Sequence, residues 1–265
     1  MLEYGKNIFY AFFIWISIAG TIFGMAYNDH SENFELSERA LEEKLCILHE
    51  QASTAYKSPH ITDSCHVFAA LDKNTKVTYF SPQSEEESNA LAKDICSRHH
   101  KIWWYVTPQT QKFNLKQHLE ELGLKPYALP AMVCALIRMD FQLPDDKSII
   151  IQRMYETNQE WQTIQSTESN PDIHTIVHYK LLHNNVLTSK GSLLFHDNWV
   201  GIFNVATEKE KQRKGFATML MNYLLHSAQQ RGAQCAILES SPEAYDLYKK
   251  VGFKELFTTY IYYRP

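Results

Sequence analysis

The feature that most limits how this chain can fold is a short basic segment, residues 212–217 (QRKGFA), between an apolar run and an amphipathic helix. Residues 199–205 (WVGIFNV) precede it and predict a buried strand. Residues 216–224 follow it, with apolar side chains at i, i+3, i+4, i+7 and i+8, and predict a helix with one buried face. A strand, a glycine-containing turn and a helix N-terminus in this order predict a site that holds an anion.

The residue types in this segment favour a phosphate group as that anion. Gly215 has no Cβ, so the backbone can approach a phosphate closely, and Ala217 keeps the next turn slim. The first N–H groups of the helix and the positive end of its dipole then face the anion. Basic side chains surround the turn at Lys209, Lys211, Arg213 and Lys214. A solvated turn is the alternative interpretation, because short glycine motifs often occur by chance.

The downstream sequence continues the alternation of strands and helices. Residues 234–238 predict a strand, and residues 258–263 predict a final aromatic strand. Between them, Ser241 is expected as the N-cap of a helix and Pro242 as its first residue. That helix carries Tyr248 and is expected to end before Gly252.

Two motifs in this order resemble the GNAT acetyltransferase superfamily. Residues 212–217 match its acyl-CoA loop, Gln/Arg-x-x-Gly-x-Gly/Ala, and residues 244–253 match its later pattern, Ala-x-x-Leu-Tyr-x-x-x-Gly-Phe. The resemblance covers residues 193–263. It implies an α+β fold with a GNAT-like mixed central sheet flanked by helices. It also implies an N-acetyltransferase that moves an acetyl group from acetyl-CoA directly to an amine in a ternary complex, without a metal.

The resemblance assigns roles to individual residues. It implies that Tyr248 protonates the leaving thiolate, whereas a packing role on the helix face is the alternative. Ser241 stands where the family often has an Asn that contacts pantetheine. The full set implied to bind acetyl-CoA is Phe203, Asn204 and Val205 for the pantetheine arm, Gln212, Arg213, Lys214, Gly215, Phe216, Ala217 and Thr218 for the pyrophosphate, and Ser241.

No general base is evident from a motif. Glu239, at the end of a predicted strand beside the cleft, is the first candidate, and His174, His178 and Asp172 are weaker ones. Where the family usually places two helices to wall the acceptor site, this chain has room for one, at about residues 157–165. We therefore expect another part of the chain to complete the acceptor site.

The N-terminal half predicts a similar order of elements: paired strands at 65–71 and 77–80, a helix at 85–99, a strand at 102–106, a helix at 114–122 and a strand at 131–139. Residues 103–108 and 119–123 resemble the N-terminal part of bacterial tandem GNAT proteins. The turn equivalent to the phosphate loop is residues 84–87 (SEEE), whose negative charges would repel a pyrophosphate. We therefore expect a degenerate GNAT-like domain at 28–140, a linker at 141–147 and an acetyl-CoA-binding GNAT domain at 148–265. The degenerate domain should cover the acceptor side through Trp103, Trp104 and Tyr105.

Residues 1–27 include an uncharged apolar segment at 8–27 that is long enough to span a bilayer. An anchor, a cleaved signal peptide and a true start at Met25 are the three alternatives. Five scattered cysteines without C-x-x-C spacing favour the cytosol, so we expect a cytoplasmic protein, with membrane attachment through 8–27 as the alternative. Cys96, His99 and His100 lack the further ligands of a zinc site.

The net charge of −4 and the pI of about 6.3 argue against a nucleic-acid partner. The expected partner is instead a small-molecule or peptide amine. Two alternatives to the N-acetyltransferase stay open: a catalytically weak CoA-binding regulatory module, and a membrane-anchored acyl or aminoacyl transferase of the same fold. The oligomeric state is left open.

Overall fold

The computed structural model describes residues 37–52, 58–62, 64–69, 75–108, 110–137, 139–141, 143, 146–157, 160–163 and 176–264. The chain divides into two units, residues 1–35 and 36–265, and the fold described below is that of the second unit. The apolar segment at 8–27 lies outside the described residues. Among the helices that the structure describes, none is both long and apolar enough to cross a membrane.

The described strands form one mixed 12-stranded sheet in the order β1-β2-β3-β4-β12-β5-β11-β10-β9-β8-β6-β7. Their bounds are β1 Ser58–Ile61, β2 Cys65–Ala69, β3 Thr75–Phe80, β4 Ile102–Val106, β5 Lys125–Ala135, β6 Ile149–Thr157, β7 Glu160–Thr163, β8 Ile176–His183, β9 Val186–His196, β10 Trp199–Thr207, β11 Cys235–Glu239 and β12 Lys254–Tyr263. Only the neighbours β3–β4 and β10–β11 run parallel among these described strands. Together with the helices on both faces, this sheet confirms the predicted α+β class.

Each parallel pair of strands encloses a helix, so the same order of elements occurs twice. The N-terminal repeat is β3, α3 (Glu85–Arg98), β4, α4 (Leu115–Glu121) and β5. The C-terminal repeat is β10, α5 (Phe216–Gln230), β11, α6 (Tyr245–Lys250) and β12. The last strands are exchanged between the repeats, because β12 pairs with β4 and β5 pairs with β11. The two repeats therefore share one continuous sheet, while the boundaries at 28–140 and 148–265 stay a prediction.

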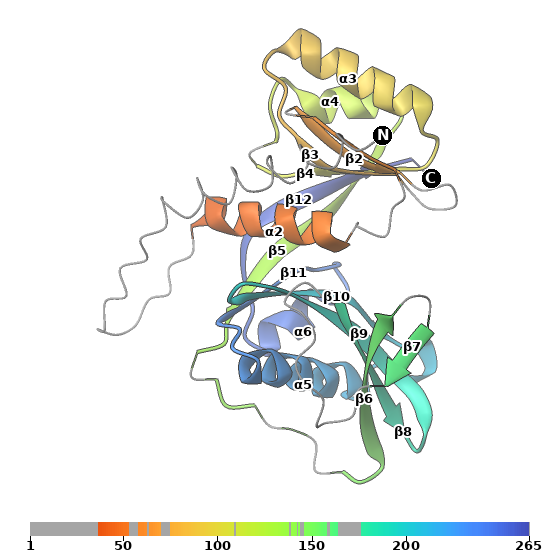
Figure 1. The fold of residues 1–265 in the computed structure, drawn as a ribbon, viewed down its shortest axis with the longest axis vertical. Coiled ribbons are helices and arrows are strands. Elements are labelled where there is room, and N and C mark those ends of the chain that lie inside the picture. Colours follow the sequence, from red (N-terminus) through yellow and green to blue (C-terminus); the bar gives the residue numbers. More distant parts are fainter. Residues whose placement is uncertain are drawn as a thin grey trace, which may run out of the picture. The chain divides into compact units, whose positions relative to one another are not determined.

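Helix α2 (Glu38–Ala52) covers one face of the sheet, and α3 to α6 cover the other (Figure 1). Leu41, Leu45 and Leu48 of α2 recur on one helical face and pack against Ala131 of β5 and Ile237 of β11. On the opposite face, the core beneath α5 and α6 contains Leu220, Leu224, Tyr179 and Leu238. Side chains alternate between the faces along each strand, so neighbouring residues of one strand enter different cores.

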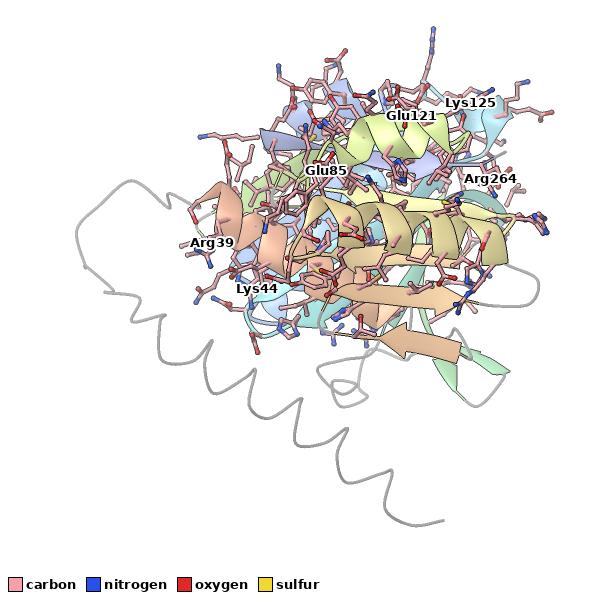
Figure 2. All side chains as sticks on the ribbon, turned by 90° about the horizontal axis from the view of Figure 1, so that it is seen from above. Arg39, Lys44, Glu85, Glu121, Lys125 and Arg264 are labelled. Carbon is pink, nitrogen blue, oxygen red and sulfur yellow. The ribbon has the colours of Figure 1, made fainter. Side chains whose placement is uncertain are left out.

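The third core lies beneath α3 and α4 and includes Trp104 and, from the last strand, Tyr262. Arg264 then donates hydrogen bonds to carbonyl oxygens of Cys96, His99 and Leu122, at the ends of both helices (Figure 2). The end of the described chain thus closes the core of the N-terminal repeat.

Several predicted elements agree with the structure and some are wrong. The helix expected at 157–165 is wrong, because residues 160–163 form β7, which pairs with β6. Ser241 does not cap α6: the helix begins at Tyr245, with Ala244 as N-cap, after a turn in which Ala244 N donates to Ser241 O. Helix α2 was not expected at all. The cysteines are free thiols, and burial raises the pKa of Cys65 to about 12.

Candidate active site

The parallel strands β10 and β11 separate part of the way along their length. They pair only from Trp199–Gly201 with Cys235–Ile237, although β10 continues to Thr207 and β11 to Glu239. On its other side β10 has a bulge: Phe203 pairs with Ser192 and Ala206 pairs with Lys190, so Asn204 and Val205 are left outside the register. Asn204 adopts a positive φ of 54° at this bulge. A bulge turns backbone groups away from the ladder and toward the opening.

The loop after β10 exposes a series of unpaired backbone donors. Residues Lys209–Lys211 form a short 3₁₀ helix, and the Gln212 side chain donates to Thr207 O at 3.2 Å. Arg213 and Gly215 then adopt left-handed φ values of 58° and 85°. No backbone carbonyl of the described residues accepts a hydrogen bond from the N–H groups of residues 213–218. This loop therefore presents free donors at the positive end of the α5 dipole.

Gly215 leaves the N-terminus of α5 both uncapped and sterically open. It is the N-cap of α5, and no side chain caps the helix. A Cβ built on Gly215 has no heavy atom within 4 Å, so the space beyond the helix N-terminus is open. The flanking Arg213 and Lys214 are exposed, and the first turn of α5 carries no acidic residue. The residues present fit a bound pyrophosphate, which needs open space, N–H donors and positive charge.

Tyr248 lies in α6 at the edge of the core under β11. Its ring contacts that of Phe253 edge to face, and burial raises the pKa of the phenol to about 12. Its hydroxyl oxygen is not among the fully enclosed polar atoms that lack a partner within the described part of the chain. The phenol therefore stays protonated at any ordinary pH. Tyr248 is thus a packing residue that carries a protonated hydroxyl.

Glu239, the first candidate for the base, is paired with a histidine from the opposite end of the sequence. Its Oε2 atom lies 2.8 Å from Nε2 of His49 in α2, and both side chains are only about a tenth exposed (11% for His49 and 10% for Glu239). The His49 ring also contacts Tyr105 of β4, at 4.3 Å between centroids, and Phe203 of β10, at 6.0 Å. The buried pair thus lies where β10 and β11 separate, beside Phe203, which the resemblance implies to contact the pantetheine arm.

Sequence reasoning missed His49, although its helix had a readable signal. Leu41, Leu45 and Leu48 have the spacing of one helical face, and Ser37 accepts a hydrogen bond from Ala40 N as an N-cap does. The pairing with Glu239 spans 190 positions of sequence, so no local pattern could indicate it.

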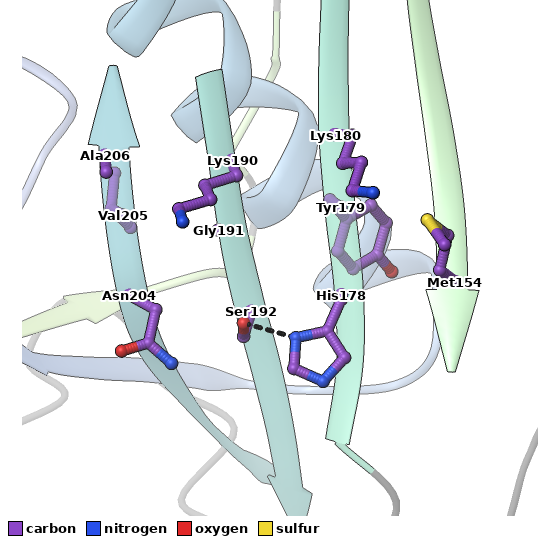
Figure 3. A pocket seen from close by; sticks show the side chains of 10 residues that line it. All are labelled: Met154, His178, Tyr179, Lys180, Lys190, Gly191, Ser192, Asn204, Val205 and Ala206. Carbon is purple, nitrogen blue, oxygen red and sulfur yellow. Dashed lines mark hydrogen bonds between the residues drawn. The ribbon is translucent and has the colours of Figure 1, made fainter. Parts of the chain in front are cut away.

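A pocket of about 540 Å³ opens beside the bulge, on the sheet face turned away from α5 (Figure 3). Asn204, Val205 and Ala206 of β10 form one side of it, and Met154 of β6 forms the other. Between them lie residues from the middle strands, where His178 Nδ1 is 2.8 Å from Ser192 Oγ. The remaining lining residues are Tyr179, Lys180, Lys190 and Gly191. The pocket therefore lies directly beside the bulge of β10.

The other predicted site residues have mixed outcomes. Phe216 is buried beneath the loop, where its ring contacts His183 at 5.1 Å, while Ala217 and Thr218 are half-buried at the helix start. The Ser241 hydroxyl bonds the Glu243 carboxylate and, with the Glu243 backbone, lowers its pKa. His178 lines the pocket, whereas His174 and Asp172 lie outside the described residues.

Of the three aromatic residues of β4 expected to cover the acceptor side, only Tyr105 contacts the His49 ring beside the strand opening. Tyr105 is buried against His49, but Trp104 packs in the core of its own repeat and Trp103 is 39% exposed. The alternation of a strand explains this, because Trp104 points to the face opposite Tyr105. No cluster of possible metal ligands occurs among the described residues, Cys96 and His99 included.

Residues 138–253, which contain the loop, the bulge and the separating strands, match the Acetyltransferase (GNAT) family. Among proteins of curated function, none matches the chain. Several solved structures share its fold at low sequence identity. One is a GCN5-related N-acetyltransferase from Kribbella flavida, with a TM-score of 0.60 at 12% identity, over 84% of this chain and 95% of that one.

Two further structures are similar to this chain. One is a GCN5-related N-acetyltransferase from Sphaerobacter thermophilus, with a TM-score of 0.52 at 12% identity over 76% of this chain and 78% of that one. The other is a tandem GNAT protein from the clavulanic acid biosynthesis pathway, with a TM-score of 0.50 at 9% identity over 75% and 77%. The family match and the shared fold agree with the open loop, the bulge and the separating strands. Residues 138–253 of this chain match the model of the Acetyltransferase (GNAT) family, and the chain shares the fold of solved GNAT structures.

Proposed function

We propose that this protein transfers an acetyl group from acetyl-CoA to an amine by direct attack in a ternary complex. The observation that carries the proposal is the unpaired N–H series of residues 213–218, at the start of an uncapped helix that has open space at Gly215. Free donors at a helix N-terminus, with no acid in the first turn, favour a phosphate ligand. The separated strands supply a slot for the pantetheine arm beside it.

The chemistry at the strand opening assigns a role to each polar group. The attacking amine bonds to the thioester carbonyl carbon, the carbon–sulfur bond breaks, and the thiolate leaves. Tyr248 supplies a proton to that thiolate, since its phenol is protonated at assay pH. Glu239 accepts the proton that the amine loses, and His49 holds the carboxylate in place through the 2.8 Å contact. Backbone N–H groups at the bulge polarise the carbonyl.

Titration of acetyl-CoA into the full-length protein tests the binding step. We expect one binding site per chain by calorimetry. Free-thiol release in the presence of an amine panel, containing amino acids, polyamines, aminoglycosides and a peptide N-terminus, then tests the transfer step. Absence of acetyl-CoA binding to the folded protein would exclude the proposal.

A CoA-binding regulatory module is the second candidate, and one observation favours it. The carboxylate at the opening, Glu239, already contacts His49 at 2.8 Å, so one of its oxygens is engaged within the protein. The same assay separates the two functions. Binding of acetyl-CoA without thiol release for any amine would favour the regulatory module.

A further inference from the structure

Two lysines from neighbouring strands line the pocket. Strand pairing places Gln152 of β6 opposite Lys180 of β8, Lys180 opposite Lys190 of β9, and Lys190 opposite Ala206 of β10. These residues form one row across four strands, so the two ammonium groups rise from neighbouring strands at the same level. Figure 3 shows both side chains on this row, with Lys190 directed toward the bulged strand β10 and Lys180 directed toward Met154 of β6.

This arrangement costs free energy unless an anion is present. Like charges directly opposite each other in an antiparallel pair are destabilising. Lys180 is half-buried, so water screens its charge incompletely. Among the described lining residues no side chain is a carboxylate, and no described residue forms a salt bridge with either lysine.

The position of the pair connects it with the acceptor. The next row across the sheet contains His178, Ser192 and Phe203, and the bulge at Asn204 separates the two rows. Two residues along a strand span about 7 Å. A carboxylate held by the lysines would therefore place a nearby amine at the bulge, where the thioester is expected. The lysines project from the sheet face opposite α5, while the α5 N-terminus supplies its own donors for the pyrophosphate.

We propose that Lys180 and Lys190 bind a carboxylate of the acceptor, so that the amine substrate is one that carries a carboxylate, such as an amino acid. This inference rests on the proposed acetyl transfer and names the substrate class for it. A phosphate of CoA is the other source of negative charge, and the experiment distinguishes it from an acceptor carboxylate.

The first arm measures kcat/KM for matched acceptors that differ only in charge: glycine with glycinamide, and 4-aminobutyrate with 4-aminobutyramide. We expect at least a ten-fold preference for one of the acids, since each charge-assisted hydrogen bond contributes roughly that factor. The amine of glycinamide is less basic, so more of it is unprotonated, and a preference for the acid cannot come from amine reactivity. In Lys180→Gln/Lys190→Gln the preference should fall to within about two-fold.

The second arm needs no turnover. Calorimetry compares N-acetylglycine with N-acetylglycinamide, with and without CoA, in the wild type, the double variant and Lys93→Gln, which removes an exposed lysine of α3 as a control. Selective binding of the acid by the wild type and the control, but not by the double variant, supports the inference.

Three results would overturn it: equal treatment of acid and amide in both arms, a preference that survives the double substitution, or weaker acetyl-CoA binding in the double variant with the preference intact. The last result would assign the lysines to CoA. Failure of the proposed transfer would be a separate result: no acetyl-CoA binding and no thiol release with any amine. In that case the calorimetric comparison of the acid with the amide alone tests whether the lysines bind a carboxylate.

Discussion

The two repeats of this protein begin their first helix in opposite ways. In the N-terminal repeat, the α3 N-terminus is closed by its own side chains: Ser84 Oγ accepts from Glu87 N, and the Glu87 carboxylate accepts from Gln83 N and Ser64 Oγ. In the C-terminal repeat, the α5 N-terminus has Gly215 as N-cap and no side-chain acceptor. A capping box satisfies the helix donors internally, whereas an uncapped helix leaves them for a ligand.

The second helices repeat the contrast. In α4 and α6 the last turn closes in the same manner, since Leu124 N donates to Leu119 O and Phe253 N donates to Tyr248 O, both at 3.0 Å. Leu119 therefore occupies in the N-terminal repeat the position that Tyr248 occupies in the C-terminal one. Both are buried, yet only one carries a hydroxyl. The two repeats therefore share their backbone arrangement and differ in a few polar groups. Those of the N-terminal repeat are satisfied internally, whereas those of the C-terminal repeat are left for a ligand.

The largest expected effect is that of Gly215→Glu, which places an acid at the N-terminus of α5, where α3 carries acids in its first turn. A carboxylate about 4 Å from a phosphate charge repels it by about 4 kcal/mol at an effective dielectric constant of about 20, roughly a thousand-fold in affinity. Calorimetry with acetyl-CoA measures the loss. Gly123→Glu is the matched control, because Gly123 also has a left-handed φ, of 83°, and open space at its Cβ. Retained affinity in a folded Gly215→Glu protein would refute the assignment of the loop.

Tyr248→Phe makes the second helix resemble that of the N-terminal repeat by removing the hydroxyl and keeping the ring. We expect kcat to fall roughly hundred-fold, the lower end for a general acid, with unchanged acetyl-CoA affinity. Because the phenol pKa is about 12, the wild-type rate should not decline through phenol ionisation up to about pH 11. Rates measured by thiol release would show a packing role instead if the variant turns over normally.

Glu239→Gln tests the position where His49 contacts both repeats, at Tyr105 on one side and Glu239 on the other. We expect roughly a ten-fold lower kcat, less than for Tyr248→Phe, because water can also take the proton from the amine. Acetyl-CoA affinity should stay within about two-fold. If kcat is unchanged while the protein loses stability, the buried pair is structural.

Ser84→Ala should affect stability alone. Loss of an N-cap side chain costs about 1 kcal/mol, which lowers the melting temperature by about 2–4 °C in a protein of this size. Ser97→Ala, at the opposite end of α3, serves as the control. Acetyl-CoA binding should be the same in both variants, and a change specific to Ser84→Ala would mean that the N-terminal repeat takes part in binding.

The smallest effect is a pH dependence at Glu87. The Gln83 backbone N–H and the Ser64 hydroxyl lower the pKa of its carboxyl, so its contribution to stability is complete above the unfolded pKa and disappears as the pH falls through the folded one. Urea unfolding should therefore show Glu87→Gln less stable than wild type at pH 7 and equally stable near pH 3. A difference that does not vary with pH would exclude a role for the charge.

Local patterns predicted the elements that depend on local physics. The span of β4 is as expected, α3 differs by one residue at its C-terminal end, and α4 differs by one residue at each end, because their periodicity and caps lie within a few positions. The start of β5 was missed because Pro126 and Pro130 usually exclude a strand. Both prolines pair with β12, and on its other side Pro130 needs no N–H, because its carbonyl oxygen accepts from Ser240 N at 2.9 Å.

Long-range pairing could not be predicted from the sequence. The exchange of β5 and β12 depends on contacts between segments far apart in the chain, and so does the pair of His49 and Glu239. The start of α5 at Gly215 was predictable for the opposite reason, because a helix N-terminus and its glycine are local features. That the loop binds a phosphate stays a prediction. The pairing of Lys180 with Lys190 could be recognised only from the strand register, since neither residue belongs to a sequence motif.

The exchanged last strand has a consequence for how the protein is made. Residues 254–263 lie between β4 and β5 and bring Tyr262 into the core of the N-terminal repeat. During synthesis, that repeat leaves the ribosome long before the strand that completes it. Until the C-terminal repeat has been translated, β4 and β5 of the nascent chain therefore lack the strand that lies between them. Their unpaired edges are accessible to chaperones and to pairing with other chains. Neither repeat can complete its sheet before β12 has been synthesised. The N-terminal repeat, which we expect to be non-catalytic, is synthesised first but still depends on this last strand.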